Sequence, residues 1–469
     1  MLPPVIVVFM LISFTCGENP AVQVILTNKG LQYGKHVGAG WIQDTLEHVT
    51  LPDINGDVLG IHYTLTGITI TKCDFPEPSL EFKQDNTGFK ASISGLSVAL
   101  TGGWMTNFGI IHDGGTFDLA IFTMDVTSVV ELGKDANGHL SVTSVSCDAQ
   151  VADVDIQFHG GESWIFNPFV EHFKGRIKSE IQSTICPNVK ESIVNLEHHL
   201  QAMNVSFDVD EDFAFALPLT GVPVVNASSL NLGLKGEFYN IKTHAEPPFE
   251  AQPFTVPEQP GYMLSLGLSE FTVNSATYGF YSAGWLQTLI TDSMIPSYLH
   301  VHLNTSSMGP YIPQLPKMFP GLLMNLQVYA RQVPMFSFQP DVVKLALQGA
   351  VKAFAIQTNH TQTPLFKLNV DSNFSGKMWV AGGRLKGSMA LENFSLTLAA
   401  SEVGPFKTDT LEGFTRMGMK FGLMKLNMEL DKGVVLPRMR HAQLVNTVLG
   451  VEEGFIAISS DAEVLTDFH

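Results

Sequence analysis

Alternation of apolar and polar residues runs through much of the first half of the chain. The segment Leu140–Phe158 alternates almost without interruption, and Ile61–Thr66 alternates over a shorter stretch. Because successive side chains of a strand point to opposite faces of a sheet, a period of two indicates strands with one buried face. The sequence therefore predicts long antiparallel strands in this half.

A second kind of spacing predicts helices. Apolar residues recur at every fourth position from Ile165 to Ile193. A repeat of four exceeds the 3.6 residues of a helical turn, so this stripe winds around its helix, as suits packing into a twisted sheet. Four longer helices are predicted, over Leu31–Val49, about Asn167–Gln201, Ala276–Ser293 and about Thr408–Glu429.

An internal duplication divides the chain. Residues 39–43 read AGWIQ and residues 283–287 read AGWLQ, and at the same offset of 244 Leu51-Pro52 matches Ile295-Pro296. A shared register over a motif and a following proline indicates two similar halves. Five prolines fall within residues 243–261, which predicts an extended linker. The expected domains are therefore residues 18–242 and 262–469, joined by this linker.

The start of the chain predicts export. Val5–Phe14 forms an apolar run, and small residues follow it, so residues 1–17 are interpreted as a signal peptide. We expect a secreted, extracellular glycoprotein. Six sequons of the form Asn-x-Ser/Thr are candidate glycosylation sites, at Asn204, Asn226, Asn304, Asn359, Asn373 and Asn393.

Composition and charge exclude several classes of function. Hydrophobic residues make up 45% of the chain and charged residues 15%, which excludes a disordered chain. The formal charge of −18 argues against binding to nucleic acid, which needs a basic surface. No catalytic, metal-binding or phosphate-binding motif occurs, so we expect neither an enzyme nor a metal or cofactor. A Ser–His pair formed only in the fold would escape this search, so a hydrolase stays as an alternative.

Cysteines are few once the signal peptide is removed. The remaining three are Cys73, Cys147 and Cys186. In a secreted chain two of the three are expected to form a disulfide.

Short motifs along the whole chain resemble one known family. They include Lys29-Gly30-Leu31, residues 234–239 (LKGEFY), residues 266–269 (LGLS) and Leu436-Pro437-Arg438. Together with the duplication and the proline-rich linker, they make the chain similar to the family of bactericidal permeability-increasing protein and lipopolysaccharide-binding protein. Cys147 and Cys186 fall where that family has its disulfide, which leaves the role of Cys73 open.

The resemblance implies a fold and a function. The fold is α+β, a boomerang of two similar barrels, each a highly twisted antiparallel sheet wrapping a long helix, joined by a central sheet. The implied function is binding of lipopolysaccharide or other bacterial lipids at the bacterial outer membrane surface, by a monomer without enzymatic activity that defends against Gram-negative bacteria. The resemblance also implies a bound phospholipid in an apolar pocket of each barrel. The candidate lining residues are Trp41, Ile177, Ile181, Trp285, Leu289, Phe414 and Phe421.

One feature departs from the bactericidal members, whose first-barrel tip is rich in Lys and Arg. The matching segment, Thr101–Gly115, contains neither. Residues 18–217 include ten basic and 26 acidic residues, a charge of −16, which disfavours long-range attraction to an anionic surface. Trp104, Met105 and Phe108 are the candidate tip contacts, which would insert apolar side chains into lipid. The alternatives are that these residues are barrel core, and that the protein carries neutral or zwitterionic lipids without lipopolysaccharide activity.

Overall fold

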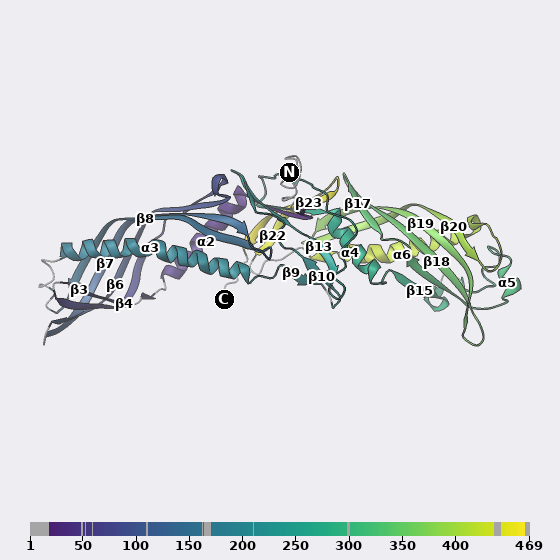
Figure 1. Ribbon diagram of the computed structural model, residues 1–469, viewed down its shortest axis with the longest axis horizontal. Helices are drawn as coiled ribbons and strands as arrows, with labels where there is room; N and C mark the ends of the chain where they lie inside the picture. Colours follow the sequence, from purple (N-terminus) through teal and green to yellow (C-terminus); the bar gives the residue numbers. More distant parts are fainter. Residues whose placement is uncertain are drawn as a thin grey trace, which may run out of the picture.

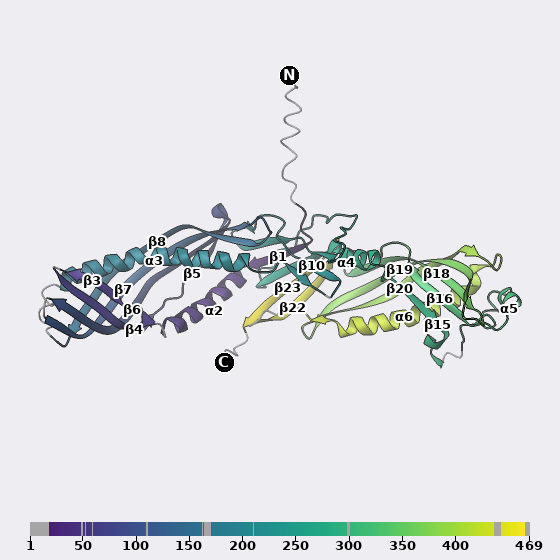
Figure 2. The same ribbon diagram turned by 60° about the horizontal axis from the view of Figure 1, so that its bottom comes forward.

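The computed structural model describes residues 18–47, 50–51, 53–58, 60–108, 111–161, 163, 170–209, 211–297, 301–435 and 442–464. The predicted signal peptide, residues 1–17, lies outside these ranges. The molecule is elongated, with two halves lying end to end and a sheet between them (Figure 1, Figure 2). Each half combines a curled antiparallel sheet with long helices, so the predicted α+β class is confirmed. Among the helices of the described residues, none is both long and apolar enough to cross a bilayer.

The first half is built on seven antiparallel strands. Five follow the spatial order β2-β4-β6-β7-β8, while β3 pairs with β4 and β5 pairs with β6. Helix α3 (Val170–Gln201) runs along β8 (Figure 1), and α2 (Asn28–Glu47) contacts β4 and β5. The strands are β2 Thr50–Leu51, β3 Ile54–Val58, β4 Ile61–Asp74, β5 Ser79–Lys83, β6 Gly88–Phe108, β7 Ile111–Lys134 and β8 Leu140–His159.

The second half repeats this plan with a second sheet of seven strands. Its order is β15-β16-β18-β19-β20-β21, with β17 paired to β18. Helix α6 (Glu412–Lys432) follows a 3-10 turn and lies on β20, and a short helix α5 (Leu315–Met318) lies at the far end (Figure 1). The strands are β15 Gln287–Thr291, β16 Met324–Ala330, β17 Met335–Gln339, β18 Val342–Ile356, β19 Gln362–Ala381, β20 Arg384–Ser401 and β21 Val434–Val435.

Both halves contribute to the central sheet. Its order is β11-β12-β1-β14-β23-β22, and the pairing of β1 with β14 joins the first half to the second. The strands are β11 Val224–Val225, β12 Ser229–Leu234, β1 Val22–Thr27, β14 Leu264–Ser269, β23 Phe455–Val464 and β22 Ala442–Glu452. A small sheet beside it consists of β9 Ser206–Asp208, β10 Phe213–Ala216 and β13 Glu237–Asn240.

The proline-rich segment 243–261 contains neither helix nor strand and is held against the central sheet. The Asn19 side chain donates a hydrogen bond to the Ala251 carbonyl at 3.0 Å. The Gln23 side chain donates to the Phe254 carbonyl at 2.7 Å, and Val256 is buried. These contacts hold residues 251–256 of the linker in place. A segment without regular structure needs such donors, because its backbone carbonyls have no partners within a helix or sheet.

Three of the four predicted helices correspond to α2, α3 and α6. The fourth, predicted over Ala276–Ser293, is confirmed only as far as Ser282 and is wrong beyond it. Helix α4 (Glu270–Ser282) ends there, a left-handed Gly284 with φ 75° comes two residues later, and β15 follows. The two copies of the motif differ in what comes next. In the first half it continues as QDTLE inside a helix, and in the second as QTLIT, whose β-branched Thr and Ile favour a strand. Trp285 therefore lies after a helix, whereas Trp41 lies within one.

Candidate functional site

The two longest packed helices leave much of their apolar faces uncovered. No residue of α6 is buried, and none of the described residues of α3 is buried. On α3, Ile177, Ile181 and Ile185 pack only partly against the sheet, and on α6 Met424 and Met428 are 50% and 56% exposed. A helix normally turns such a stripe into the core. Apolar side chains on both helices are therefore left uncovered by the rest of the protein.

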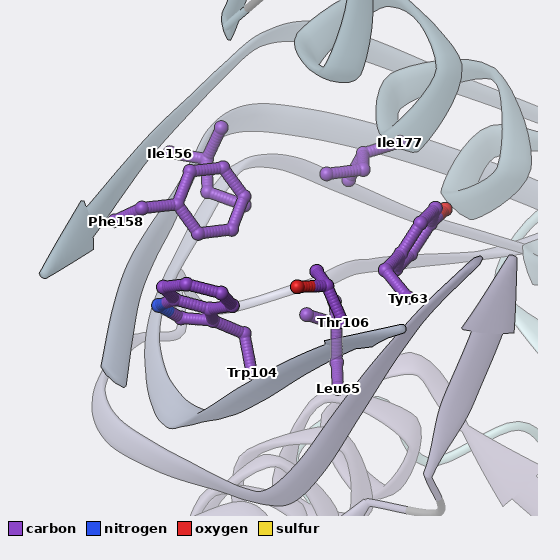
Figure 3. A pocket seen from close by; sticks show the side chains of 7 residues that line it. All are labelled: Tyr63, Leu65, Trp104, Thr106, Ile156, Phe158 and Ile177. Carbon is purple, nitrogen blue, oxygen red and sulfur yellow. The ribbon is translucent and has the colours of Figure 1, made fainter. Parts of the chain in front are cut away.

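An apolar cavity lies between α3 and the sheet of the first half (Figure 3). It is close to the ends of β4, β6 and β8 that lie farthest from the second half (Figure 1). Apart from its open mouth the space is small, with room for little more than one water molecule. Its walls are Tyr63 and Leu65 of β4, Trp104 and Thr106 of β6, Ile156 and Phe158 of β8, and Ile177 of α3.

Trp104 is held firmly in the wall of this cavity. Its indole Nε1 donates a hydrogen bond to the His159 carbonyl at 3.2 Å, and its ring meets Phe158 edge-on, with ring centroids 6.1 Å apart. Gly115 is its cross-strand partner on β7. A Cβ at Gly115 would lie 2.0 Å from the His159 carbonyl oxygen and 2.8 Å from Trp104 Nε1, so this position needs glycine. The backbone at Gly115 and His159 therefore packs closely against the Trp104 ring.

Among the described residues that line the cavity, none is charged. The Thr106 side chain is 7% exposed, and its hydroxyl points toward Trp104 (Figure 3). The Tyr63 hydroxyl turns away from Trp104 and lies against Gly56 of β3 (Figure 3). A wall of hydrocarbon and aromatic rings with so few polar atoms suits an apolar ligand.

Cations near this end of the barrel are engaged by groups of the protein itself. Lys174 of α3 forms ion pairs with Asp155 at 2.9 Å and Glu171 at 3.2 Å. The hydrogen bond from Lys174 holds the pKa of Asp155 below its ordinary value, and Asp155 and Glu171 raise the pKa of Lys174. Arg176 donates to the Asp57 carbonyl at 2.6 Å, and Lys178 donates to the Ala152 carbonyl at 2.8 Å. These three side chains therefore form no cluster of unengaged cations for an anionic headgroup.

The structure places the predicted lining residues of the first pocket in different positions. Ile177 lines the cavity, and Ile181 lies one turn further along the same stripe, partly buried. Trp41 belongs to α2, but its side chain lies outside the described part of the structure.

The predicted lining residues of the second pocket lie in two different environments. Trp285 is 50% exposed and packs edge-on against Phe213, with centroids 5.2 Å apart, and Leu289 on β15 is 44% exposed. Phe414 belongs to the hydrophobic cluster of the second half, while Phe421 of α6 lies under the Lys425 ammonium, 4.9 Å from its ring centroid. The first pair is displaced from its predicted helix because α4 ends before Trp285.

The predicted tip contacts Trp104 and Met105 lie on opposite faces of β6. The assignment of Trp104 as a tip contact is wrong. Trp104 is 2% exposed and belongs to the barrel core, because it shares the inward face with its cross-strand neighbour Leu65. Met105 points the other way and is 53% exposed, so its contact with lipid stays a prediction. The Phe108 side chain lies outside the described residues.

Cys147 of β8 and Cys186 of α3 form a disulfide, as the resemblance implied, with Cα atoms 5.7 Å apart. This bond ties the helix to the last strand of the sheet. Cys73 is outside the disulfide and half-buried on β4. Five of the six sequon asparagines are exposed and Asn304 is half-buried.

Sequence reasoning missed most of the cavity wall: Tyr63, Leu65, Thr106, Ile156 and Phe158. The alternation in β4 and β8 was a usable signal, because Tyr63 and Leu65 share one face, as do Ile156 and Phe158. Which residues meet across strands depends on register, and β4 and β6 shift register at two places. The alternation of residues within a single strand does not reveal these shifts in register.

Comparison with known proteins gives consistent matches over the chain. The N-terminal domain model of the LBP / BPI / CETP family matches residues 30–201, and the C-terminal domain model of that family matches residues 208–464. The chain is 36% identical over 460 residues to a bactericidal permeability-increasing protein of Sebastes schlegelii, covering 97% of each chain. It is 25% identical to the lipopolysaccharide-binding protein of Homo sapiens, covering 99% of this chain and 98% of that protein.

A solved structure supports the fold. The crystal structure of a lipopolysaccharide binding protein matches with a TM-score of 0.58 and 24% identity, covering 95% of this chain and all of that one. At 24% identity, this match shows that the two chains share the two-domain fold.

Proposed function

Because the chain belongs to the LBP / BPI / CETP family, we propose that it is a secreted protein of innate defence that binds lipopolysaccharide, through lipid A, or other bacterial lipids. Membership makes it a non-enzymatic lipid-binding protein. In the proposal it acts at the outer membrane of Gram-negative bacteria. Phospholipid acyl chains occupy the apolar interior of each half.

The observation that carries this proposal is the uncovered apolar face of α3 and α6. Burial of apolar surface stabilises by roughly 25 cal/mol per Å², so each 100 Å² that an acyl chain covers contributes about 2.5 kcal/mol. A chain lying against Ile177, Ile181 and Ile185 would complete the packing that the sheet leaves unfinished. Met424 and Met428 offer a similarly adaptable surface in the second half, because thioether side chains adjust to irregular ligands.

A second candidate is carriage of neutral or zwitterionic lipids. It is favoured by the charge of the first half, −16 over residues 18–217, and by the absence of Lys and Arg from residues 101–115. The nearest α3 cations are already engaged by Asp155, Glu171 and backbone carbonyls. An anionic headgroup would therefore meet no unengaged cation in these parts of the chain.

Vesicle binding separates the two candidates. The secreted protein is titrated with phosphatidylcholine vesicles, with and without lipid A, at equal lipid concentration. The lead proposal expects at least tenfold tighter binding when lipid A is present. Equal binding to both vesicles would favour the carrier, and binding to neither would contradict both.

A matched pair of variants tests the tip. Met105→Asp adds a charge to an exposed side chain near the distal end, and Phe122→Asp does the same at a 45% exposed position further along the sheet, on β7. If the tip enters the lipid surface, the first variant weakens vesicle binding and the second does not.

A further inference from the structure

We propose that the outward face of the first sheet, at its distal end, docks onto an anionic lipid bilayer in acidic surroundings through three histidines. We call this surface the histidine face, and its histidines are His62, His112 and His159. The inference rests on the proposed lipid-binding function and adds to it a headgroup charge and a pH range. It comes from the register of the strands, the hydrogen bonds of the histidines and the exposure of the residues beside them.

Strand register places two of the histidines in one row. Asp57 of β3 lies directly opposite His62 of β4. His62 in turn lies opposite Asn107 of β6, which lies opposite His112 of β7. Residues directly opposite each other in an antiparallel pair point to the same face of the sheet. The row therefore crosses four neighbouring strands on one face, near the end where β4 begins and β6 ends (Figure 1).

The row points outward, and the third histidine shares its face. Met105 lies two residues before Asn107 on β6 and is 53% exposed, whereas its neighbours on either side are buried. His159 of β8 lies opposite Thr116 of β7, four residues after His112. An even spacing along a strand keeps side chains on one face. All three histidines therefore lie on the outward face of the sheet.

Two of the histidines are paired with carboxylates and are still accessible. His62 Nδ1 lies 2.9 Å from Asp57 Oδ1, and His159 Nε2 lies 3.0 Å from Asp118 Oδ2. The side chains of His62 and His159 are 53% and 49% exposed. A carboxylate beside the ring favours the protonated imidazole, and about half of each ring remains open to a lipid headgroup.

Acid changes the charge of the histidine face. Histidine is the side chain that gains a positive charge between pH 8 and 5. At neutral pH the face carries the carboxylates of Asp57 and Asp118, which repel an anionic bilayer. Protonation of their histidine partners neutralises both. Protonation of His112, whose Nδ1 contacts the uncharged side chain of Asn107, adds a positive charge.

Other charged groups near this end of the sheet do not supply such a change. They are Asp113, Asp155, Glu171, Lys174, Arg176 and Lys178. Lys174 pairs with Asp155 and Glu171, and the side chains of Arg176 and Lys178 donate to backbone carbonyls. Carboxylates, ammonium groups and guanidinium groups ordinarily keep their charge between pH 8 and 5. The pH dependence is therefore assigned to the three histidines.

The surroundings of the row suit a bilayer. The exposed Met105 side chain lies beside the row, and an apolar side chain next to cations matches the boundary between headgroups and hydrocarbon. Each positive charge held near an anionic lipid surface strengthens binding by about fivefold. A gain of three charges therefore predicts at least tenfold tighter binding in acid, even where salt reduces the contribution of each.

Vesicle titrations at two pH values test the inference. The probes are vesicles of phosphatidylglycerol and phosphatidylcholine in equal parts, and vesicles of phosphatidylcholine alone, at about pH 7.5 and about pH 5.5. Phosphatidylglycerol keeps its negative charge over this range. We expect the protein to bind the anionic vesicles at least tenfold more tightly in acid, without a comparable gain on phosphatidylcholine. No gain on the anionic vesicles, or an equal gain on both, would overturn the inference.

A matched pair of variants assigns the gain to these histidines. The tip variant is His62→Gln/His112→Gln/His159→Gln, in which each glutamine keeps hydrogen-bonding capacity but gains no charge. The control replaces three exposed histidines elsewhere, as His36→Gln/His198→Gln/His199→Gln. The tip variant should lose most of the gain in acid, and the control should keep it. Equal gains in the two variants would overturn the assignment.

A further measurement uses the unaltered protein and does not depend on the folding of any variant. Diethyl pyrocarbonate modifies accessible imidazoles, and bound anionic vesicles should protect His62, His112 and His159 from it, but not His198. Modification that is the same with and without vesicles would overturn the docking surface. Binding to lipid A vesicles at neutral pH without any gain in acid would overturn this inference and leave the proposed function intact. Failure to bind any vesicle at either pH would overturn both.

Discussion

Replacing Asp461 by Ala should loosen the junction between the two halves. Asp461 lies on β23 and is 9% exposed. Its carboxylate accepts hydrogen bonds from Lys29 Nζ at 2.7 Å, from the Met263 amide at 3.1 Å and from Asn446 Nδ2 at 3.3 Å. Lys29 belongs to the first turn of α2 and also donates to the Gly261 carbonyl at 2.8 Å. One carboxylate therefore links a helix of the first half to the end of the linker and to two strands of the second.

The size of the effect follows from these contacts. Hydrogen bonds to charged groups contribute about 1.5–3 kcal/mol each, but they are not additive. The Lys29 side chain is 42% exposed, so its share is reduced to about 1 kcal/mol or less by solvent. We expect Asp461→Ala to lower the free energy of unfolding by about 2–3 kcal/mol, and Lys29→Met by at most about 1 kcal/mol.

Urea unfolding followed by circular dichroism measures the change, with Glu429→Ala as the control. That variant removes an ion pair with Lys432 in which both side chains are about two-thirds exposed, so its effect should stay within about 0.5 kcal/mol. If Asp461→Ala proves no more destabilising than Glu429→Ala, the structural role assigned to this carboxylate is wrong.

The same carboxylate gives the junction a defined dependence on pH. Burial alone would raise the pKa of Asp461, but the hydrogen bonds from Lys29 and Asn446, together with the Lys29 charge, lower it below its ordinary value. A group with a lowered pKa in the folded state stabilises fully above its unfolded-state pKa, about 3.9 for Asp, and this contribution disappears as the pH falls through the folded-state pKa. The difference in stability between the native chain and Asp461→Ala should therefore be constant from pH 8 to about 5 and shrink in stronger acid. A difference that grows with acid would contradict the sign of this argument.

Three further predictions concern other parts of the chain. Asn373 and Asn393 face each other on β19 and β20, with a side-chain hydrogen bond of 2.9 Å, so glycopeptide mapping should find no chain glycosylated at both; a doubly modified chain would contradict this pairing. Gly115→Ala should destabilise by about 1–3 kcal/mol through its clash with His159, while Gly34→Ala, whose Cβ would meet no atom within 4 Å, should be neutral or stabilising; thermal melts in which the two behave alike would refute the fit around Trp104. If the tip binds lipopolysaccharide by apolar contact, affinity should change little between low and physiological salt, because residues 101–115 contain no Lys or Arg, and a tenfold fall would indicate a basic site elsewhere.

Much of the fold could be predicted because its signals are local. The fourfold spacing along α3 and the alternation of β8 each follow from one element, and both predictions agree with the structure to within a few residues. The failure at Ala276–Ser293 has a local cause as well. The Ala-Gly-Trp motif is compatible with a helix or a turn, and the residues that follow it decide between them.

The candidate site was less predictable because it depends on contacts between distant strands. Trp104 belongs to the core because the register of β4 and β6 places it opposite Leu65, and that register shifts twice along the pair. A sequence pattern shows that Trp104 and Met105 face opposite sides of a strand, but not which side is inside. The Cys147–Cys186 bond, by contrast, was available only through resemblance to a family, since the spacing of three cysteines leaves several pairings open.

Native mass spectrometry of the secreted chain, after removal of glycans, tests the central claim most directly. The account predicts a main species heavier than the polypeptide by one lipid in each half, with phospholipid identified after extraction. Removal of the lipid should increase hydrogen exchange in α3 and α6, whose apolar faces the protein itself leaves uncovered. A main species at the mass of the bare polypeptide, which takes up no lipid and in which α3 and α6 exchange as slowly as the buried strands, would contradict the account.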